Sequence, residues 1–110
     1  MKKIVIFGKR IPYEVQTFIE RTIDSLVQEG CSIFIYKRFQ TRINEHWGLN
    51  WNFPEFKSRE DILKSQPDFL LVIGGDGTLL DATTLVEGTD IPIIGLNTGR
   101  LGFLANITRD

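Results

Sequence analysis

The sequence has little cysteine and histidine, with one of each among 110 residues. The lone Cys31 cannot form an intramolecular disulfide, and its isolation suits a reducing compartment. One Cys and one His also exclude a zinc cluster of the usual kind. The charges nearly cancel, with 13 Lys and Arg against 14 Asp and Glu, and neither half of the chain has the basic excess that nucleic-acid binding requires.

Long hydrophobic runs are also missing. The longest apolar runs, at 69–73 and 91–94, are far too short to cross a bilayer. The run 4–7 after Lys2 and Lys3 is too short for a signal peptide. We therefore expect a cytoplasmic protein without a membrane or nucleic-acid partner. The composition, 42% apolar and 25% charged, is that of one ordinary globular domain.

Short apolar runs alternate with helical patterns along the chain, which is typical of an α/β fold. Strands are expected at 2–7, 33–36, 69–73 and 91–96. The spacing of apolar residues predicts one long helix after Pro12, ended by Gly30, and a second helix over 79–86. We expect a three-layer, Rossmann-like domain with a mostly parallel sheet.

The segment 37–57 has a less regular pattern, from which we expect a short helix near 40–46 followed by an extended loop. We expect its large aromatic side chains to form a small cluster of their own under the loop: Trp47, Trp51, Phe53 and Phe56. Three basic residues are expected on a solvated face: Lys37, Arg38 and Arg42. Next along the chain, Ser58 and Asp61 match a helix-start box, in which the hydroxyl and the carboxylate each bind a backbone amide.

Two glycine-rich loops follow neighbouring strands. The loop 74–78 follows the strand 69–73, and the loop 97–103 follows the strand 91–96. A right-handed β-α-β crossover returns the chain parallel to the strand it left, so both loops should lie at the carboxyl ends of adjacent strands. This is the edge at which open α/β sheets bind ligands.

The first of these loops combines three glycines with a carboxylate. Glycine amides, with the N-terminus of a helix beginning near Thr78, suit phosphate oxygens. Phosphates would repel Asp76 unless it accepts a proton from an attacking hydroxyl or holds a metal ion between itself and the phosphates. The alternative without a catalytic role is an ordinary turn aspartate whose side chain hydrogen-bonds its own backbone. A dinucleotide fingerprint is excluded by Leu80, and no P-loop lysine follows the glycines.

The Gly-Gly-Asp-Gly-Thr sequence at 74–78 resembles the signature shared by NAD kinases, diacylglycerol and sphingosine kinases, and 6-phosphofructokinases. The Asn-Thr-Gly-Arg-Leu-Gly-Phe-Leu sequence at 97–104 is similar to the Asn-x-Gly-x-Leu-Gly-Phe-Leu stretch of NAD kinases. The Gly-Thr-Gly-Asn-Asp type of loop found in lipid kinases is absent there. The resemblance to NAD kinases is specific over 68–107 and general over 1–67.

This resemblance implies a kinase that phosphorylates the 2′-hydroxyl of the NAD adenosine ribose, with ATP or polyphosphate as donor and Mg²⁺ or another divalent cation as cofactor. Asp76 would accept the hydroxyl proton, and no residue is assigned as a direct metal ligand. The residues expected to bind nucleotide are Gly74, Gly75, Asp76, Gly77, Thr78, Asn97, Arg100, Leu101, Gly102 and Phe103. Residues 1–110 would form the N-terminal domain of a longer homo-oligomeric enzyme, inactive without a β-rich C-terminal domain.

Two departures from the family pattern accompany this interpretation. Asp81 stands where the family often has a basic residue, and the family's Asn-Glu or Asn-Asp motif is not found in the chain. Arg100 could bind phosphate or be a solvated loop charge, and Phe103 could line the pocket or belong to the core. Two other functions remain open: a lipid kinase of the same superfamily, and a non-catalytic nucleotide-sensing module.

Overall fold

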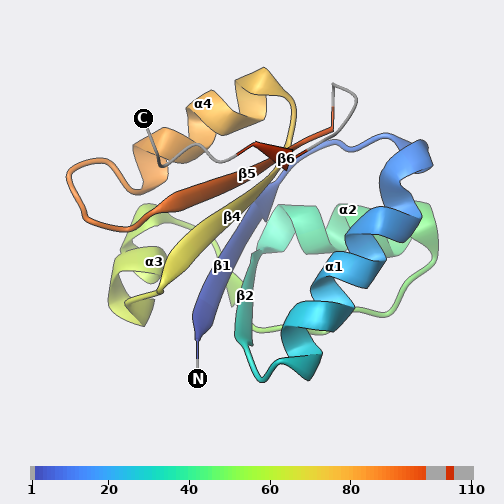
Figure 1. Ribbon diagram of the computed structural model, residues 1–110, viewed down its shortest axis with the longest axis horizontal. Coiled ribbons are helices and arrows are strands. Elements are labelled where there is room, and N and C mark those ends of the chain that lie inside the picture. Colours follow the sequence, from blue (N-terminus) through green and yellow to red (C-terminus); the bar gives the residue numbers. More distant parts are fainter. Residues whose placement is uncertain (1, 99–103, 106–110) are drawn as a thin grey trace.

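The computed structural model describes residues 2–98 and 104–105, which contain one six-stranded sheet. The strands lie in the order β3-β2-β1-β4-β5-β6 (Figure 1), and all neighbours are parallel except β5 and β6. The strands are β1 (Lys3–Gly8), β2 (Ser32–Tyr36), β3 (Glu55–Phe56), β4 (Phe69–Gly74), β5 (Ile93–Asn97) and β6 (Leu104–Ala105). The helices are η1 (Tyr13–Val15), α1 (Gln16–Gln28), α2 (Lys37–Trp47), α3 (Arg59–Ser65) and α4 (Asp76–Leu85).

Helices cover both faces of the sheet, so the predicted three-layer α/β fold is confirmed (Figure 1). Successive side chains of a strand point to opposite faces, and both faces are buried here. In β1, Ile4 and Ile6 pack with α1 and α2, whereas Val5 and Phe7 pack with α3 and α4. This is why the central strands read as unbroken apolar runs rather than as alternating patterns.

The helix predicted after Pro12 is present, with a 3-10 turn before it. Ile19 and Ile23 of α1 are fully buried against the sheet, and Gly30 ends this part of the chain with φ +86°. Phe18 and Val27, which the spacing places on the same face, are 38% and 45% exposed. The buried stripe of α1 is therefore narrower than the sequence pattern suggests.

The helix predicted near 40–46 is present as α2, and an irregular segment follows it, but the prediction for 37–57 was wrong in three respects. The helix α2 begins directly after β2 and is longer than predicted, and the short strand β3 was not predicted at all. The aromatic residues do not form a separate cluster either. Trp47, Trp51 and Phe53 pack against the core beneath α1 and α2, and Phe56 is buried in the core on the opposite face. A two-residue strand at the sheet edge leaves no periodicity in a sequence, but pairing β3 with β2 sends Phe56 into the other layer.

Two side-chain amides on α2, those of Gln40 and Asn44, hold in place the chain that follows the helix. Gln40, only 3% exposed, accepts a hydrogen bond from the Phe53 amide nitrogen (2.9 Å) and donates to the Phe53 carbonyl (3.2 Å) and to a carboxylate oxygen of Glu55 (2.6 Å). Asn44 makes the same two-way pairing with the backbone of Trp51, at 2.9 Å in both directions. Gln40 and Asn44 thus give the backbone of this irregular segment the hydrogen bonds that a neighbouring strand would give it in a sheet.

Only half of the predicted box at the start of α3 forms. Ser58 occupies the position before the helix but makes no capping hydrogen bond with its side chain. Asp61 does reach back, and its carboxylate accepts a hydrogen bond from the amide of Lys57 at 2.9 Å. The helix ends at Ser65 and Gln66 takes a left-handed conformation, φ 50°, just before Pro67.

Candidate active site

The two glycine-rich loops start from adjacent strands, as predicted. Gly74 of β4 lies in register with Asn97 of β5, and the amide of Thr98 donates to the Gly74 carbonyl at 3.0 Å. Because β4 and β5 are parallel, both loops leave the sheet at the same carboxyl edge. The described part of the second loop ends at residue 98, and the expected nucleotide-binding residues Arg100, Leu101, Gly102 and Phe103 lie outside the described residues.

Asp76 is the first residue of α4, which begins two residues earlier than expected. The amide of Leu79 donates to the Gly75 carbonyl at 3.1 Å, and this bond closes the first helical turn. A carboxylate is favourable at this position, because the helix dipole places partial positive charge at the N-terminus. The Asp76 side chain is exposed and lies in the positive end of the α4 dipole, at the edge of the sheet where ligands bind.

The orientation of the Asp76 carboxylate is set from the neighbouring strand. The Nδ2 atom of Asn97 donates to Oδ1 of Asp76 at 3.0 Å, and Asn97 is itself only 7% exposed. A buried amide has few alternative positions, so it holds the exposed carboxylate in place. The two predicted site residues Asp76 and Asn97, 21 positions apart, thus form one unit.

The glycines of the first loop serve different purposes. Gly74 has φ +155°, and a Cβ there would come within 2.8 Å of the Thr78 side chain, so the fold itself requires glycine. Gly75 and Gly77 have open space where a Cβ would stand, and positive φ is found at neither. Gly74 thus uses the conformational freedom of glycine, whereas Gly75 and Gly77 contribute only the absence of a side chain.

Among the described residues, no atom covers the N-terminal end of α4 at Gly75 and Gly77. In an α-helix the amides of the first turn have no carbonyl partner within the helix. Gly75 and Gly77 add no side chain between these amides and an approaching anion, since nothing lies within 4 Å of the Cβ positions. The arrangement can cradle phosphate oxygens with backbone donors and offers one carboxylate beside them.

The donor groups at this edge fit a divalent cation that arrives with phosphates. Within residues 2–98 and 104–105, no group of three or more His, Cys, Asp and Glu side chains is placed to hold a metal ion. Mg²⁺ is commonly bound by one or two carboxylates together with substrate phosphates and water. Asp76 can supply one such carboxylate.

Asp81, the departure from the family pattern, has a basic partner. The Lys9 ammonium, on the segment after β1, forms an ion pair with the Asp81 carboxylate of α4, and both side chains are about half exposed. The ion pair connects the segment after β1 to α4, the helix that begins with Asp76. Positive charge is therefore present beside position 81, although it comes from the segment after β1.

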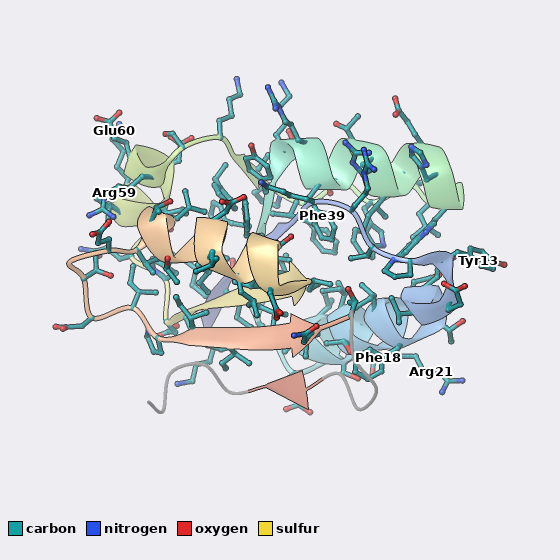
Figure 2. The ribbon with its side chains drawn as sticks, turned by 90° about the horizontal axis from the view of Figure 1, so that it is seen from above. Tyr13, Phe18, Arg21, Phe39, Arg59 and Glu60 are labelled. Carbon is teal, nitrogen blue, oxygen red and sulfur yellow. The ribbon has the colours of Figure 1, made fainter. Side chains whose placement is uncertain are left out.

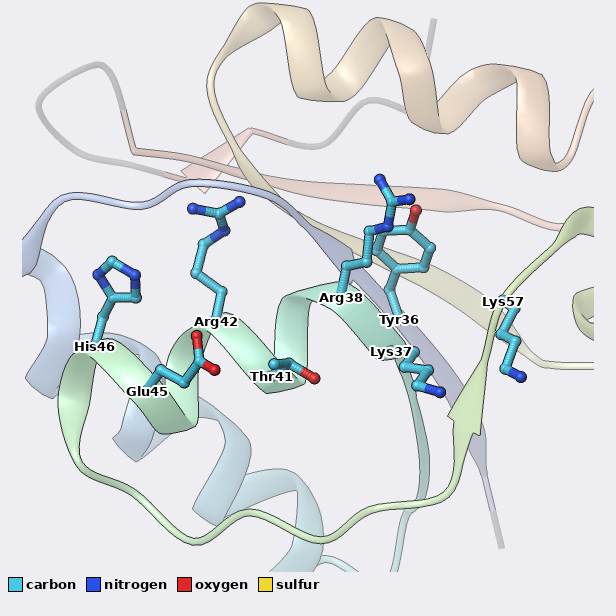
Figure 3. A pocket seen from close by; sticks show the side chains of 8 residues that line it. All are labelled: Tyr36, Lys37, Arg38, Thr41, Arg42, Glu45, His46 and Lys57. Carbon is cyan, nitrogen blue, oxygen red and sulfur yellow. The ribbon is translucent and has the colours of Figure 1, made fainter.

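A second feature of this edge was not assigned a ligand from the sequence. Basic side chains on and around α2 line a hollow of about 830 Å³ (Figure 3). Lys37, Arg38 and Arg42 are exposed there, which confirms the predicted solvated face. The available signal was their position, because two of them follow directly on a strand, at the same edge as the glycine loops.

The described helices were also compared with the length and hydropathy of membrane-spanning helices. Among the described helices, none combines the length and the apolar character needed to span a membrane.

Comparison with known proteins places the chain in a family. A family model described as ATP-NAD kinase N-terminal domain matches residues 4–110. The chain is 37% identical over 108 residues to an NAD kinase of Flavobacterium psychrophilum, covering 98% of the chain and 36% of that relative. An NAD kinase of Cytophaga hutchinsonii is 41% identical over 98 residues, covering 88% of the chain and 27% of the relative. An NAD kinase of Geobacter sp. is 34% identical over 110 residues, covering 100% and 36%.

The chain thus spans about a third of the length of the curated relatives it matches. The match also reaches well beyond the 68–107 region that carries the specific motifs. Sequence, fold and loop geometry agree: this chain belongs to the ATP-NAD kinase N-terminal domain family.

Proposed function

We propose that this chain is the N-terminal domain of an NAD kinase, which transfers a phosphoryl group to the 2′-hydroxyl of the NAD adenosine ribose and produces NADP. The observation that carries the proposal is the Asp76 carboxylate, fixed by Asn97 at the uncovered N-terminus of α4. Phosphoryl transfer needs donors that hold the phosphate and a base beside the attacking hydroxyl, and this corner offers both.

Asp76 acts as the base in this mechanism. As the ribose 2′-oxygen attacks the terminal phosphorus of the donor, its proton passes to the Asp76 carboxylate. The bond between that phosphorus and its bridging oxygen breaks, and the shortened donor leaves. Asn97 is a positioning residue, since it holds the carboxylate by a hydrogen bond of 3.0 Å.

The backbone around Gly75 and Gly77 holds the donor phosphates. Thr78, in the first turn of α4, lies beside Gly74 and contributes to the same corner. Bound Mg²⁺ would neutralise phosphate charge, with Asp76 as the residue able to coordinate it. ATP or polyphosphate is the proposed donor, and the four expected residues of the second loop would contact the nucleotide: Arg100, Leu101, Gly102 and Phe103.

The remaining parts of the proposal concern the whole protein. We propose that a further, β-rich domain and assembly as a homo-oligomer complete the grip on NAD. The curated relatives are about three times as long as the chain, which leaves room for such a domain. A cytoplasmic location is supported by the single cysteine.

The test is the reaction itself. Full-length protein is incubated with ATP and Mg²⁺ and either NAD or diacylglycerol, and NADP is measured by an enzyme-coupled assay. We expect NADP and no phosphorylated lipid. Phosphorylation of diacylglycerol instead would identify a lipid kinase, and NAD binding without any product would identify a nucleotide-sensing module; either result overturns the proposal.

A further inference from the structure

Positive charge is concentrated on one part of the carboxyl edge. Three adjoining hollows of about 830, 430 and 280 Å³ share Arg42 in their linings. Together they are lined by six of the 13 Lys and Arg residues of a chain whose net charge is −1. We call this surface the cationic trough, and its basic residues are Lys9, Arg10, Lys37, Arg38, Arg42 and Lys57. Among the described residues, its lining contains one acidic residue, Glu45.

The fold brings these residues together from three strand ends. Lys9 and Arg10 follow β1, Lys37 and Arg38 follow β2, and Lys57 follows β3. Because β1, β2 and β3 are parallel, all three ends lie at the same edge of the sheet. Figure 3 shows Arg38 and Arg42 projecting from α2 toward the segment that follows β1.

The placement of these charges on α2 is unfavourable for the helix. Lys37 and Arg38 occupy the first turn, which contains no acidic residue, although the helix dipole disfavours cations there. Arg38 and Arg42 are four residues apart, a spacing at which like charges repel on one helix face. Local rules that a fold violates without structural gain are typical of functional sites.

The cations are also poorly neutralised within the protein. In the described part of the chain, Lys9 has an ion-pair partner, Asp81, and none is found for the other five basic residues of the trough. An anionic ligand would supply what the fold omits. Arginine is suited to phosphate, since its planar guanidinium can donate two parallel hydrogen bonds to phosphate oxygens.

The trough leads to the glycine loop. Gly8, at the end of β1, lines one of the three hollows and lies in register with Ile73, the residue before Gly74. Neighbouring strands are about 4.8 Å apart, so the inner end of the trough is about one strand spacing from the loop that carries Asp76. A linear anion lying over the ends of β3, β2 and β1 would point one end at that loop.

We propose that the cationic trough binds a linear condensed phosphate, the phosphate chain of the donor, through Arg38 and Arg42 above all. The row of cations fits a ligand with a negative charge on each of several linked units, either inorganic polyphosphate or the triphosphate tail of a nucleotide. That this bound chain is the donor rests on the proposed function, whereas the binding itself does not.

The binding test uses inorganic tripolyphosphate, which lacks a nucleoside, titrated calorimetrically into the full-length protein. The variant combines Arg38→Gln and Arg42→Gln. The matched control combines Arg21→Gln and Lys64→Gln, which remove the same charge from exposed positions on α1 and α3; Figure 2 shows Arg21 extending away from the body of the molecule. Losing two charge-assisted contacts should weaken tripolyphosphate binding about tenfold or more, and the control by less than about twofold.

Two further readouts make the result specific. The Arg38→Gln, Arg42→Gln variant should melt no lower than the parent, because relieving the repulsion on α2 costs the fold nothing. Its affinity for NAD should be unchanged. A raised KM for polyphosphate alone would assign the trough to the inorganic chain, and a raised KM for ATP as well would assign it to the triphosphate tail.

Equal losses of tripolyphosphate affinity in variant and control would overturn the trough as a site. So would a single-stranded oligoribonucleotide that binds more tightly than polyphosphate of the same charge, because the surface would then serve nucleic acid. If the parent makes no NADP but the calorimetric contrast holds, the proposed function fails while the condensed-phosphate site stands.

Discussion

The carboxyl edge of this sheet is built in two different ways on its two sides. Over β4 and β5 the chemistry is carried by backbone: uncovered amides at the start of α4, made accessible by Gly75 and Gly77, with one fixed carboxylate. Over β1, β2 and β3 it is carried by long basic side chains around α2. The first side suits a reacting phosphoryl group that must be held in one geometry. The second suits a linear condensed phosphate, whose negative charges are spread along several linked units.

The largest expected effect concerns what both sides lack. Residues 1–110 supply a base and a phosphate cradle, but we place the grip on NAD in residues beyond this chain. Holding reactants in line accounts for about 7–11 kcal/mol of barrier lowering, so the isolated chain should produce no sustained NADP. The measurement is coupled NADP detection with purified 1–110, NAD, ATP and Mg²⁺, and full-length protein as reference. Turnover comparable to the full-length protein would contradict the two-domain account.

The glycine loop over β4 and β5 could be predicted from the sequence, because the residues that define it are close together in the chain. The glycine loop follows directly on a buried apolar strand, and parallel crossover geometry alone places Asp76 and Asn97 together. The α2 side depends on partners distant in sequence. Gln40 binds Phe53 and Glu55, and Phe56 crosses to the other core layer through a two-residue strand. Neither leaves a periodic pattern, so α2 was predicted too short and β3 was missed.

The second prediction breaks the α2 side and spares the glycine loop. Gln40→Leu removes the side chain that pairs with the partly buried backbone groups of Phe53, which should lower the free energy of unfolding by about 1–3 kcal/mol. Urea denaturation measures the change. Gln28→Leu, at an exposed position near the end of α1, is the control and should change stability by less than about 0.5 kcal/mol. Equal effects of the two changes would remove Gln40 from its structural role.

The third prediction breaks the glycine loop through the fold. Gly74→Ala places a Cβ 2.8 Å from Thr78 in a backbone conformation that side chains rarely adopt. The strain should cost about 1–3 kcal/mol of stability, read from the same urea transitions. Activity should fall as well, because the start of α4 shifts. A variant as stable as the parent would show that the close approach of β4 to Thr78 is not required.

The fourth and smallest effect has the opposite sign. Gly77→Ala meets open space at ordinary φ, so it should raise the free energy of unfolding by about 0.4–1 kcal/mol. The added methyl group nevertheless stands beside the amides that hold phosphate, and the KM for the donor should rise. A stabilised variant with unchanged donor kinetics would place the cradle elsewhere. The contrast with Gly74→Ala separates a glycine that the fold needs from a glycine that the ligand needs.

The central claim is that Asp76 takes the proton of the attacking hydroxyl. Asp76→Asn keeps the size of the side chain and its place beside Asn97 but cannot accept that proton. We measure kcat for NADP formation and the melting temperature of the full-length variant and parent under the same conditions. The account predicts a kcat lower by about 10²–10⁴-fold with little change in melting temperature. A variant that keeps near-normal turnover would contradict it.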